Sequence, residues 1–413
     1  MYNRKGDVNM KLNCLVLFGG ESVEHEISVL TAHQAIENLD KNKYEVIPVY
    51  ISKNSEFYTS DLLKDLANYG DLDALCKQCT KIVFYQKDGQ AYFKALKTSL
   101  FDKSETRIDV ALPCVHGTNG EDGVLQGLLQ MYHIPYAGCD NIAAAIGQDK
   151  VHMKQILESE HLPITKWTWF YAHEFIKNND AILDHVEKSV GYPCVVKPSN
   201  LGSSIAIHVA EDRNELSEYI DEACQYDCKV IVEKKVEHLR EINASVIGNI
   251  ETCKVATLEE VGMNNHGKLL DYSLKYEGGN KGGKLGSKVG GSKNANLSTG
   301  SKGMASTDRQ VPANLSDKNT QLIQSLAKKV FRTLGSSGVC RIDFMLNDAT
   351  KEIYVNEINT IPGSLSYYLW EATNLSFKDE LDELIQLALK RDQDRKQKIF
   401  SYDTNILQSY AKK

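Results

Sequence analysis

The chain alternates between short apolar runs and longer amphipathic segments, a pattern that predicts an α/β protein. The runs typical of buried strands occupy residues 11–18, 44–51 and 109–114. Helical spacing fills residues 21–39 and 124–131, and strands that alternate with helices predict a parallel sheet. Ligands bind outside the carboxyl ends of such strands, which makes Glu24 and His116 candidates for a site. A lone acid or histidine at a strand end is more often structural.

A second unit with helices and strands is predicted from Asp149 onward. Its helices are predicted at residues 150–161 and 181–189, and its strands at residues 167–170 and 194–207. The last range is two strands around Gly202-Ser-Ser204, and Lys197 lies in the first of them. Backbone N–H groups of such a loop approach phosphate oxygens closely, and the lysine adds a positive charge. A phosphate-binding loop is therefore predicted; a plain hairpin turn is the alternative, and it leaves Lys197 unexplained.

Two further strand-like runs, residues 229–232 and 240–247, have acids at or near their ends. An adenine ring needs a short apolar strand that offers backbone groups, and a ribose needs a carboxylate acceptor. Glu233 and Glu241 fit these two tasks. On the pattern alone, exposed surface acids are the alternative.

The strongest chemical signal is a pair of strands around the turn residues 347–351. Arg341 and Asp343 share a face of the first strand, and Glu357 and Asn359 share a face of the second, because strand side chains alternate. A hairpin would bring the four polar groups together. Buried carboxylates and a guanidinium are costly unless cations and phosphate oxygens satisfy them, and oxygen-only ligation suits Mg2+ shared with a nucleotide. A surface hairpin with polar residues in water is the alternative.

Composition and charge indicate which kind of molecule the protein binds. The 413 residues are 42% hydrophobic and 25% charged, with a net charge of −7, which gives no reason to expect nucleic acid. Small-molecule partners are expected instead. The apolar run nearest the start is too short for a signal sequence or a membrane span, so a cytoplasmic protein without membrane contact is predicted. The ten cysteines are scattered, and reduced thiols are expected rather than disulfides or zinc.

Residues 275–302 contain eight glycines and six lysines against one acid, a composition that cannot form a core. A long cationic loop over residues 277–310 is predicted, either an active-site lid or a passive insertion. Residues 1–10 are predicted to be a disordered extension. The helix after the loop is predicted to begin at the N-cap Ser316. Its core-facing positions are predicted to be Leu322, Leu326, Val330 and Leu334.

The motifs, taken in chain order, resemble those of the D-alanine-D-alanine ligases of the ATP-grasp superfamily. They are Glu24-His-Glu26, His116-Gly117, Asp149-Lys150, Lys197-Pro-Ser, Glu233-Lys234, Lys275-Tyr276, Arg341-Ile-Asp343 and Asn356-Glu-Ile-Asn-Thr-Ile-Pro-Gly363. The resemblance spans about residues 11–390. It implies an α/β fold of three domains: an N-terminal parallel-sheet domain at residues 11–148, and two α+β domains, at 149–232 and 233–413, that sandwich ATP.

The resemblance also implies a reaction and the residues that perform it. ATP would phosphorylate the carboxylate of one D-alanine, and the amine of a second would attack the acylphosphate, releasing ADP and phosphate. The catalytic positions implied are Glu24, Ser203, Tyr276, Arg341 and Gly363. Those that bind the nucleotide are Lys150, Lys197, Ser204, Glu233, Lys234, Val236, Glu241 and Lys275. The ligands of two Mg2+ or Mn2+ ions are Asp343, Glu357 and Asn359. Those that contact the amino acids are His116, Ser366, Tyr368 and Leu369.

Tyr368 departs from the family pattern, because many members have a serine there that binds the carboxylate of the second substrate. Ser366 is an alternative anchor for that carboxylate. D-serine, D-lactate or another amino acid is accordingly an alternative second substrate. From a different class, a nucleotide-binding protein without catalysis is disfavoured, because the arginine and all three metal ligands are present. The resemblance further implies a homodimer that serves peptidoglycan precursor synthesis.

Overall fold

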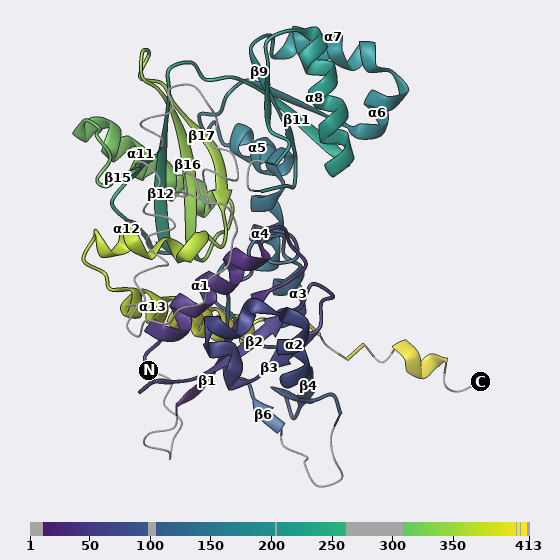
Figure 1. Cartoon of the computed structure of the whole chain (residues 1–413), viewed down its shortest axis with the longest axis vertical. Coiled ribbons are helices and arrows are strands. Elements are labelled where there is room, and N and C mark those ends of the chain that lie inside the picture. The colour runs from purple at the N-terminus through teal and green to yellow at the C-terminus, as the bar shows by residue number, and fades with distance from the viewer. Residues whose placement is uncertain are drawn as a thin grey trace, which may run out of the picture.

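The computed structural model describes residues 11–97, 105–202, 205–261, 309–401, 403–404 and 406–410. Within these ranges the chain forms three β-sheets, and helices pack around them (Figure 1). Several predictions lie outside these ranges: those for residues 1–10, for nearly all of the 277–310 segment, and for Ser203, Ser204, Lys275 and Tyr276.

The first sheet has seven strands in the order β6-β5-β4-β3-β2-β1-β7. They are β1 Leu12–Gly19, β2 Tyr44–Ile51, β3 Phe57–Thr59, β4 Thr80–Lys87, β5 Gln90–Ala95, β6 Glu105–Arg107 and β7 Val110–Pro113. The strands β2, β1 and β7 pair in parallel, as their apolar runs predict. The remaining strands add an antiparallel extension that the sequence pattern did not predict. The carboxyl ends of β1 and β7 therefore lie next to each other.

The helices of this first unit are α1 His25–Asn38, α2 Leu72–Gln78, α3 Val124–Met131 and α4 Asn141–Gln148, with 3-10 turns η1 Asp61–Lys64 and η2 Leu66–Gly70. The range of α3 is as predicted. Helix α1 begins later than predicted, because Gly20 and Ser22 form a turn in which the Ser22 Oγ accepts a hydrogen bond from the Glu24 N–H at 3.1 Å. This turn places Glu24 at the N-cap of α1.

The second sheet has four antiparallel strands in the order β10-β9-β11-β8. They are β8 Trp167–Tyr171, β9 Cys194–Pro198, β10 His208–Ala210 and β11 Lys229–Lys234. The helices of this unit are α5 Lys150–Ser159, α6 Ala172–Lys177, α7 Asn179–Ser189 and α8 Arg213–Tyr226. The pairing of β9 with β10 confirms a strand, a loop and a returning strand, but the returning strand lies at His208–Ala210, just after the predicted range of 194–207.

The third sheet follows the order β15-β14-β12-β16-β17, and β13 pairs with β12. Its strands are β12 Leu239–Gly248, β13 Cys253–Val255, β14 Glu259–Val261, β15 Arg309–Gln310, β16 Gly338–Asn347 and β17 Ile353–Asn359. One face is apolar: Ile342, Phe344 and Val355 are buried in the same core cluster as side chains of helix α11, Asp317–Thr333. The other face of β16 and β17 carries the polar residues of the predicted hairpin.

Helix α11 begins at the predicted N-cap Ser316, whose side chain accepts a hydrogen bond from the Asn319 N–H. One core position was wrong: Leu322 is 44% exposed. The buried stripe is Ile323, Ala327, Val330, Phe331 and Leu334. Neighbouring helix positions point about 100° apart, so a stripe that passes through Ile323 leaves Leu322 at its edge.

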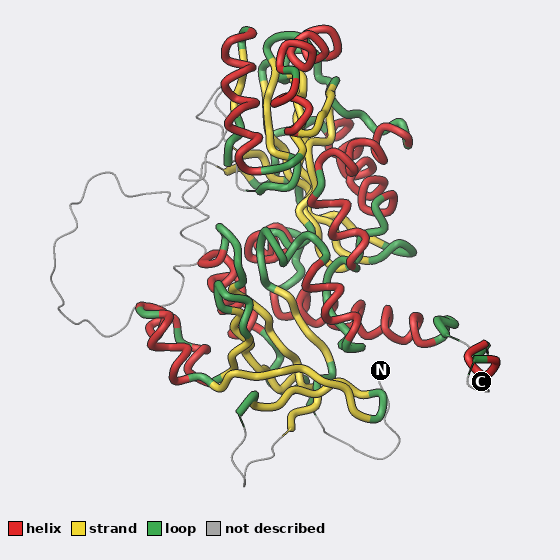
Figure 2. The backbone as a smooth tube through the Cα atoms, turned by 90° about the vertical axis from the view of Figure 1, so that its right-hand side faces the viewer, coloured by secondary structure: helices red, strands yellow, loops and turns green. Residues whose placement is uncertain are grey.

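The C-terminal part of the chain folds back onto the first sheet. It contains η3 Gly363–Ser366, α12 Tyr367–Glu371, α13 Phe377–Lys396 and η4 Ile406–Ser409. Leu381 and Leu384 of α13 share a core cluster with Val110 and Leu112 of β7. Arg391 also donates hydrogen bonds to the carbonyls of Tyr136 and Gly138 at 2.6 and 2.5 Å. The first and last parts of the chain therefore pack together: the purple elements and the yellow helix α13 lie side by side in Figure 1, and Figure 2 shows the backbone from the side.

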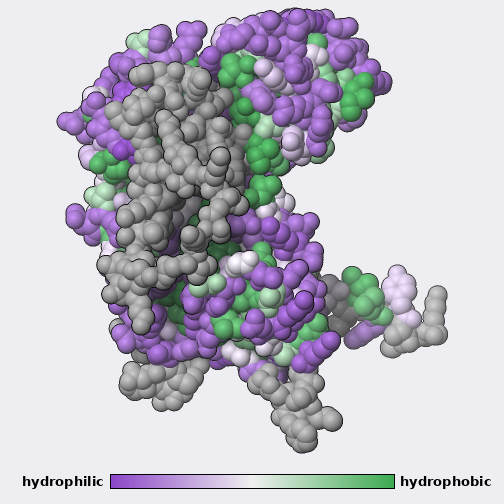
Figure 3. All heavy atoms as spheres, in the orientation of Figure 1, coloured by the Kyte–Doolittle hydropathy of each residue, from purple (hydrophilic) through white to green (hydrophobic). Residues whose placement is uncertain are grey.

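Hydrophilic side chains cover much of the described surface in Figure 3, and the segment after α13 extends away from the body with Phe400 and Leu407 exposed. None of the helices in the described ranges is both long and apolar enough to cross a membrane. All ten cysteines are free thiols, as expected from their scatter.

Candidate active site

The predicted hairpin forms and gathers its four polar groups on one face. Arg341 pairs with Asn359, and Asp343 pairs with Glu357, between β16 and β17. Residues directly opposite each other on antiparallel strands point to the same side of the sheet. The register then shifts, because Asn356 is an extra residue on β17. This bulge lets Asn356 accept a hydrogen bond at 3.3 Å from Lys197, which belongs to the second sheet.

Arg341 and Asp343 form a bidentate ion pair. The guanidinium Nε and Nη2 donate to the two Asp343 oxygens at 2.7 and 2.8 Å, and the Asn359 amide donates to the same carboxylate at 3.1 Å. Burial alone would lower the pKa of Arg341, but the Asp343 charge outweighs it and raises that pKa well above the usual range. Arg341 therefore stays a fixed positive charge next to the carboxylates.

Asp343, Glu357 and Asn359 fit a hard divalent cation, because they place two carboxylates and an amide oxygen on one face of the sheet. We call this surface the metal-ligand face. A carboxylate has about four lone-pair sites, so Asp343 can keep Arg341 and still bind a metal. Within the described ranges, no group of three or more His, Cys, Asp or Glu side chains could hold a metal ion. The ligand shell here would need other oxygens, such as those of phosphates and water.

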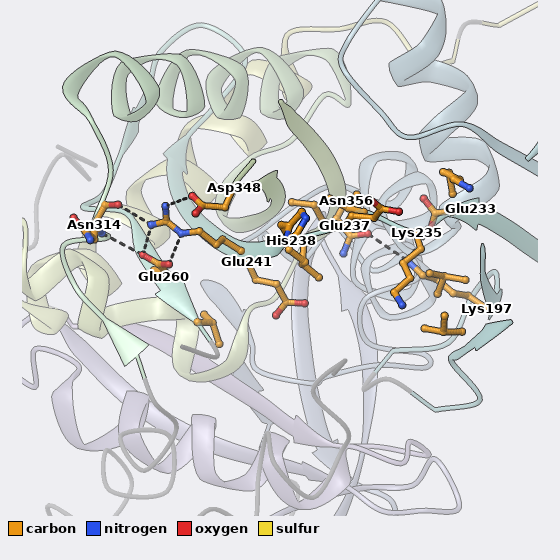
Figure 4. A pocket seen from close by; sticks show the side chains of 18 residues that line it. Lys197, Glu233, Lys235, Glu237, His238, Glu241, Glu260, Asn314, Asp348 and Asn356 are labelled. Carbon is orange, nitrogen blue, oxygen red and sulfur yellow. Dashed lines mark hydrogen bonds and ion pairs between the residues drawn. The ribbon is translucent and has the colours of Figure 1, made fainter. Parts of the chain in front are cut away.

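A cavity of about 860 Å³ lies between the second and third sheets. Five of the predicted nucleotide-binding residues line it: Lys197, Glu233, Lys234, Val236 and Glu241. Figure 4 shows Lys197 and Glu233 at one end and Glu241 nearer the middle. Lys150 is not among the lining residues; its ammonium donates to the Leu201 carbonyl at 2.8 Å and lies 3.8 Å from Glu357. It therefore lies between the loop after β9 and the metal-ligand face.

Glu233 is buried between two lysines at the end of this cavity. Its carboxylate oxygens lie 2.6 Å from the Lys154 ammonium and 2.7 Å from the Lys197 ammonium. Burial would raise the pKa of Glu233, but the two lysines outweigh it and lower that pKa far below the usual range. Burial also lowers the pKa of Lys154. The carboxylate thus stays ionised and fixes Lys197 where the cavity can receive phosphate.

Glu24, at the N-cap of α1, and Gly117, after β7, form the wall nearest the first sheet. Glu24 is 8% exposed, and a Cβ atom on Gly117 would lie 2.7 Å from the Glu24 Oε2. Gly117 also has a positive φ of 71°, so glycine is needed here for both space and backbone conformation. A Cβ on Gly202 would lie 3.4 Å from the same oxygen. Glu24 therefore faces the loop that was predicted to bind phosphate.

His116 joins this wall to the segment after β17. Its Nδ1 contacts the Ile361 carbonyl oxygen at 2.8 Å, and its Nε2 contacts the Thr31 Oγ1 at 2.7 Å. Burial lowers the pKa of His116, but Glu121, 3.7 Å away, outweighs it and raises that pKa. Both ring nitrogens are thus engaged with the protein, and His116 fixes residues that lead to Gly363.

The turn after Gly363 has an unusual backbone. Ser364, Leu365 and Ser366 all have positive φ angles, of 52°, 53° and 58°. Ser366 is fully buried, and its Oγ has no hydrogen-bond partner within the described part of the chain. Such strain persists only where the surrounding structure fixes it, and it is concentrated at functional sites.

Tyr368 and Leu369 follow this turn in α12. Leu369 is fully buried. The Tyr368 hydroxyl donates to Glu259 Oε2 at 3.1 Å and accepts from Arg309 Nη1 at 2.9 Å. The hydroxyl is therefore bonded to two protein side chains, neither of which the sequence analysis had selected.

Two models of known families match most of the chain. The model described as D-ala D-ala ligase N-terminus matches residues 13–139, and the one described as D-ala D-ala ligase C-terminus matches residues 156–302 and 297–386. The chain belongs to the D-alanine-D-alanine ligase family.

Curated relatives and solved structures from this family are similar over nearly their whole length. The D-alanine--D-alanine ligase of Thermosipho melanesiensis is 36% identical over 397 residues, which cover 96% of this chain and 98% of the relative. The D-alanine--D-alanine ligase of Clostridium acetobutylicum is 34% identical, and the alignment covers 93% of this chain and 99% of the relative. The structure of the D-alanine-D-alanine ligase from Coxiella burnetii aligns with a TM-score of 0.74 at 26% identity, covering 98% and 99%. The VanG D-Ala:D-Ser ligase from Enterococcus faecalis aligns with a TM-score of 0.71 at 26% identity, covering 92% and 100%. The fold of this family member is accordingly the α/β ATP-grasp fold.

Sequence reasoning missed three residues of this ligase site: Lys154, Glu259 and Arg309. Lys154 lies on α5, where a helical lysine is normally exposed, and its partner Glu233 comes from a distant strand. Glu259 and Arg309 lie on short strands either side of the glycine-rich segment. These charged side chains can be buried only because each pairs with an opposite charge from another element. The sequence pattern does not show which elements lie side by side.

Proposed function

We propose that this chain is an ATP-dependent ligase that joins two D-alanines through a D-alanyl phosphate, giving D-alanyl-D-alanine, ADP and phosphate for peptidoglycan precursor synthesis. The observation that carries the proposal is the face with Arg341, Asp343, Glu357 and Asn359 beside a cavity that contains Lys197. Full-length relatives with the same named activity support it. Their names do not favour an alternative second substrate.

In this mechanism the nucleotide occupies the cavity between the second and third sheets. Lys150 and Lys197 bind its phosphates, and Glu233 and Glu241 contact its base and ribose. Asp343, Glu357 and Asn359 would hold two Mg2+ or Mn2+ ions, which would neutralise phosphate charge. Lys234 and Val236 line the same cavity. Ser204 and Lys275, outside the described residues, are assigned to the phosphates by family resemblance.

The first D-alanine binds between the first sheet and the metal-ligand face. Glu24 accepts its ammonium, with Ser203 and Tyr276 as hydrogen-bonding partners. One oxygen of its carboxylate attacks the γ-phosphorus, and the bond from that phosphorus to the ADP oxygen breaks. Arg341, a fixed cation, stabilises the negative charge that develops. His116 holds the segment that leads to Gly363 in position through its contacts with Thr31 and the Ile361 carbonyl.

The amine of the second D-alanine then attacks the acyl carbon. The developing oxyanion receives hydrogen bonds from Arg341 and the Gly363 N–H. As the tetrahedral intermediate collapses, the C–O bond to phosphate breaks, and the proton lost by the attacking nitrogen leaves with the phosphate. Ser366, Tyr368 and Leu369 border the second substrate. A homodimer and a cytoplasmic location complete the proposal.

Trapping the acylphosphate tests this route. With ATP, Mg2+, D-alanine and hydroxylamine, we expect D-alanine hydroxamate together with ADP, because hydroxylamine attacks the same acyl carbon as the second amine. The Arg341→Ala variant should form less. Hydroxamate accompanied by AMP and pyrophosphate would instead indicate an adenylate and overturn the proposed mechanism.

A further inference from the structure

A cluster of Glu259, Arg309 and Tyr368 lies on the same face of the third sheet as the metal ligands. Glu259 of β14 pairs directly with Asn243 of β12, and Asn243 pairs directly with Asp343 of β16. Opposed residues on neighbouring strands share a face, and two strand spacings separate Glu259 from Asp343 by about 10 Å. The cluster therefore lies about 10 Å from the metal ligand Asp343, measured across two strand spacings.

Every partner of the Glu259 carboxylate in this cluster is a side chain. Glu259 is fully buried; its Oε1 accepts from Arg309 Nη1 at 2.8 Å, and its Oε2 accepts from the Asn243 amide at 3.0 Å and from the Tyr368 hydroxyl at 3.1 Å. These three hydrogen bonds replace the contacts with water that a buried carboxylate loses. Removing one partner would leave a buried charge poorly satisfied.

The cluster fixes the phenol of Tyr368 in both position and hydrogen bonding. The only proton of its hydroxyl goes to Glu259, and its oxygen accepts from Arg309, whose guanidinium carbon also lies 5.5 Å from the ring centroid. The hydroxyl thus has no proton left for the carboxylate of a substrate. The ring remains as a rigid surface near Arg341, whose charge interacts with both Tyr368 and Glu259.

We propose that Glu259 and Arg309 determine specificity for the second substrate, because they hold the Tyr368 ring as a wall that admits only a small D-amino acid. The inference rests on the proposed ligase function. The nucleotide cavity contains Lys197 and Glu241, so the acceptor must approach Arg341 from another side. Arg341 and Tyr368 interact electrostatically, and a bulky acceptor side chain near Arg341 would collide with a ring that cannot move aside.

Competition between acceptors tests this assignment. With D-alanine as donor, D-alanine and D-2-aminobutyrate compete as acceptors, and the two dipeptides are separated by mass. We expect Glu259→Gln to raise the proportion of the D-2-aminobutyrate product about tenfold relative to wild type, since the ring loses an ionic anchor. Arg309→Lys should shift it in the same direction, because a lysine keeps the charge but loses the planar guanidinium that lies over the Tyr368 ring. Arg309→Lys also provides the test if Glu259→Gln does not fold.

The matched control is Glu187→Gln. Glu187 on α7 also accepts hydrogen bonds from an arginine, Arg213 at 2.9 Å, and from a tyrosine hydroxyl, Tyr192 at 2.9 Å, but it does not line the nucleotide cavity. Its product ratio should stay within twofold of wild type. Hydroxamate formation from D-alanine reports the first step separately. A folded Glu259 or Arg309 variant with normal hydroxamate formation and an unchanged product ratio would overturn the inference, whereas absence of hydroxamate in the wild type would overturn the ligase proposal itself.

Discussion

Arg341 is the residue on which the proposed chemistry depends most. It forms two hydrogen bonds to Asp343, and its raised pKa keeps it charged throughout the pH range of an assay. We predict that Arg341→Ala lowers kcat by about 10²- to 10³-fold, the usual effect of removing one donor to a developing oxyanion. Steady-state ADP release measures this.

Arg213→Ala is the control for that substitution. Arg213 also forms ion pairs with acids, including Asp180 and Asp184, but its side chain is 36% exposed, against 17% for Arg341. We expect its kcat to remain near wild type. Equal losses in the two variants would mean that Arg341 has only a structural role.

Glu233 gives a prediction for stability against pH. Its pKa is lowered in the folded state, so the folded protein binds fewer protons there than the unfolded chain. The stabilisation is present above the unfolded value of about 4.3 and is lost as pH falls toward the folded pKa. We predict that Glu233→Gln loses about 3–5 kcal/mol of unfolding free energy at pH 7, because Lys154 is left buried without its counter-charge.

Urea unfolding at pH 7 and at pH 4 measures that difference, which should be smaller at pH 4. Glu26→Gln is the matched control: its ion pair with Lys53 is 3.1 Å long, with both side chains more than half exposed. Exposed pairs contribute about 0–1 kcal/mol. A Glu233→Gln variant as stable as Glu26→Gln at pH 7 would contradict the buried network.

Among the elements, the apolar strand runs and α3 could be predicted because their pattern and bounds are local. The hairpin of β16 and β17 could be predicted from period-two spacing and the turn residues 347–351. The bulge at Asn356 could not, because it depends on a register shift between strands. The same limit applies to Lys154 and Glu259, whose charges are buried only because partners from distant strands pair with them.

The η3 turn gives a prediction at the element scale. Ser366 combines a left-handed backbone with a buried hydroxyl that lacks a partner among the described residues. Glycine adopts this conformation without the strain of about 1–2 kcal/mol that other residues have. We predict that Ser366→Gly raises the unfolding free energy by about 1–2 kcal/mol while it weakens binding of the second substrate.

Two measurements check this prediction: the urea midpoint, and the KM of the second D-alanine. Ser336→Ala is the control, since Ser336 is also a fully buried serine but has no positive φ. It should keep the wild-type KM. A destabilised Ser366→Gly protein would show that this turn is not strained.

At the level of the whole molecule, the proposed nucleotide site lies between the second and third sheets, so a bound nucleotide would contact both. Ligand binding to the folded state alone adds about 2.7 kcal/mol at 100 times Kd. We therefore predict that a non-hydrolysable ATP analogue with Mg2+ raises Tm by a few degrees, and that Lys197→Met loses more than half of this shift. Lys188→Met, at an exposed position of α7, should keep it. Differential scanning fluorimetry is sufficient, and equal shifts in both variants would place the nucleotide elsewhere.

The most direct test of the central claim is a product analysis with purified protein, ATP, Mg2+ and D-alanine. We predict that D-alanyl-D-alanine, ADP and phosphate form in equal amounts, as measured by mass spectrometry and by phosphate release. The Arg341→Ala variant should give a sharply lower yield of the dipeptide. ATP consumption without dipeptide, or dipeptide formation unaffected by Arg341→Ala, would contradict it.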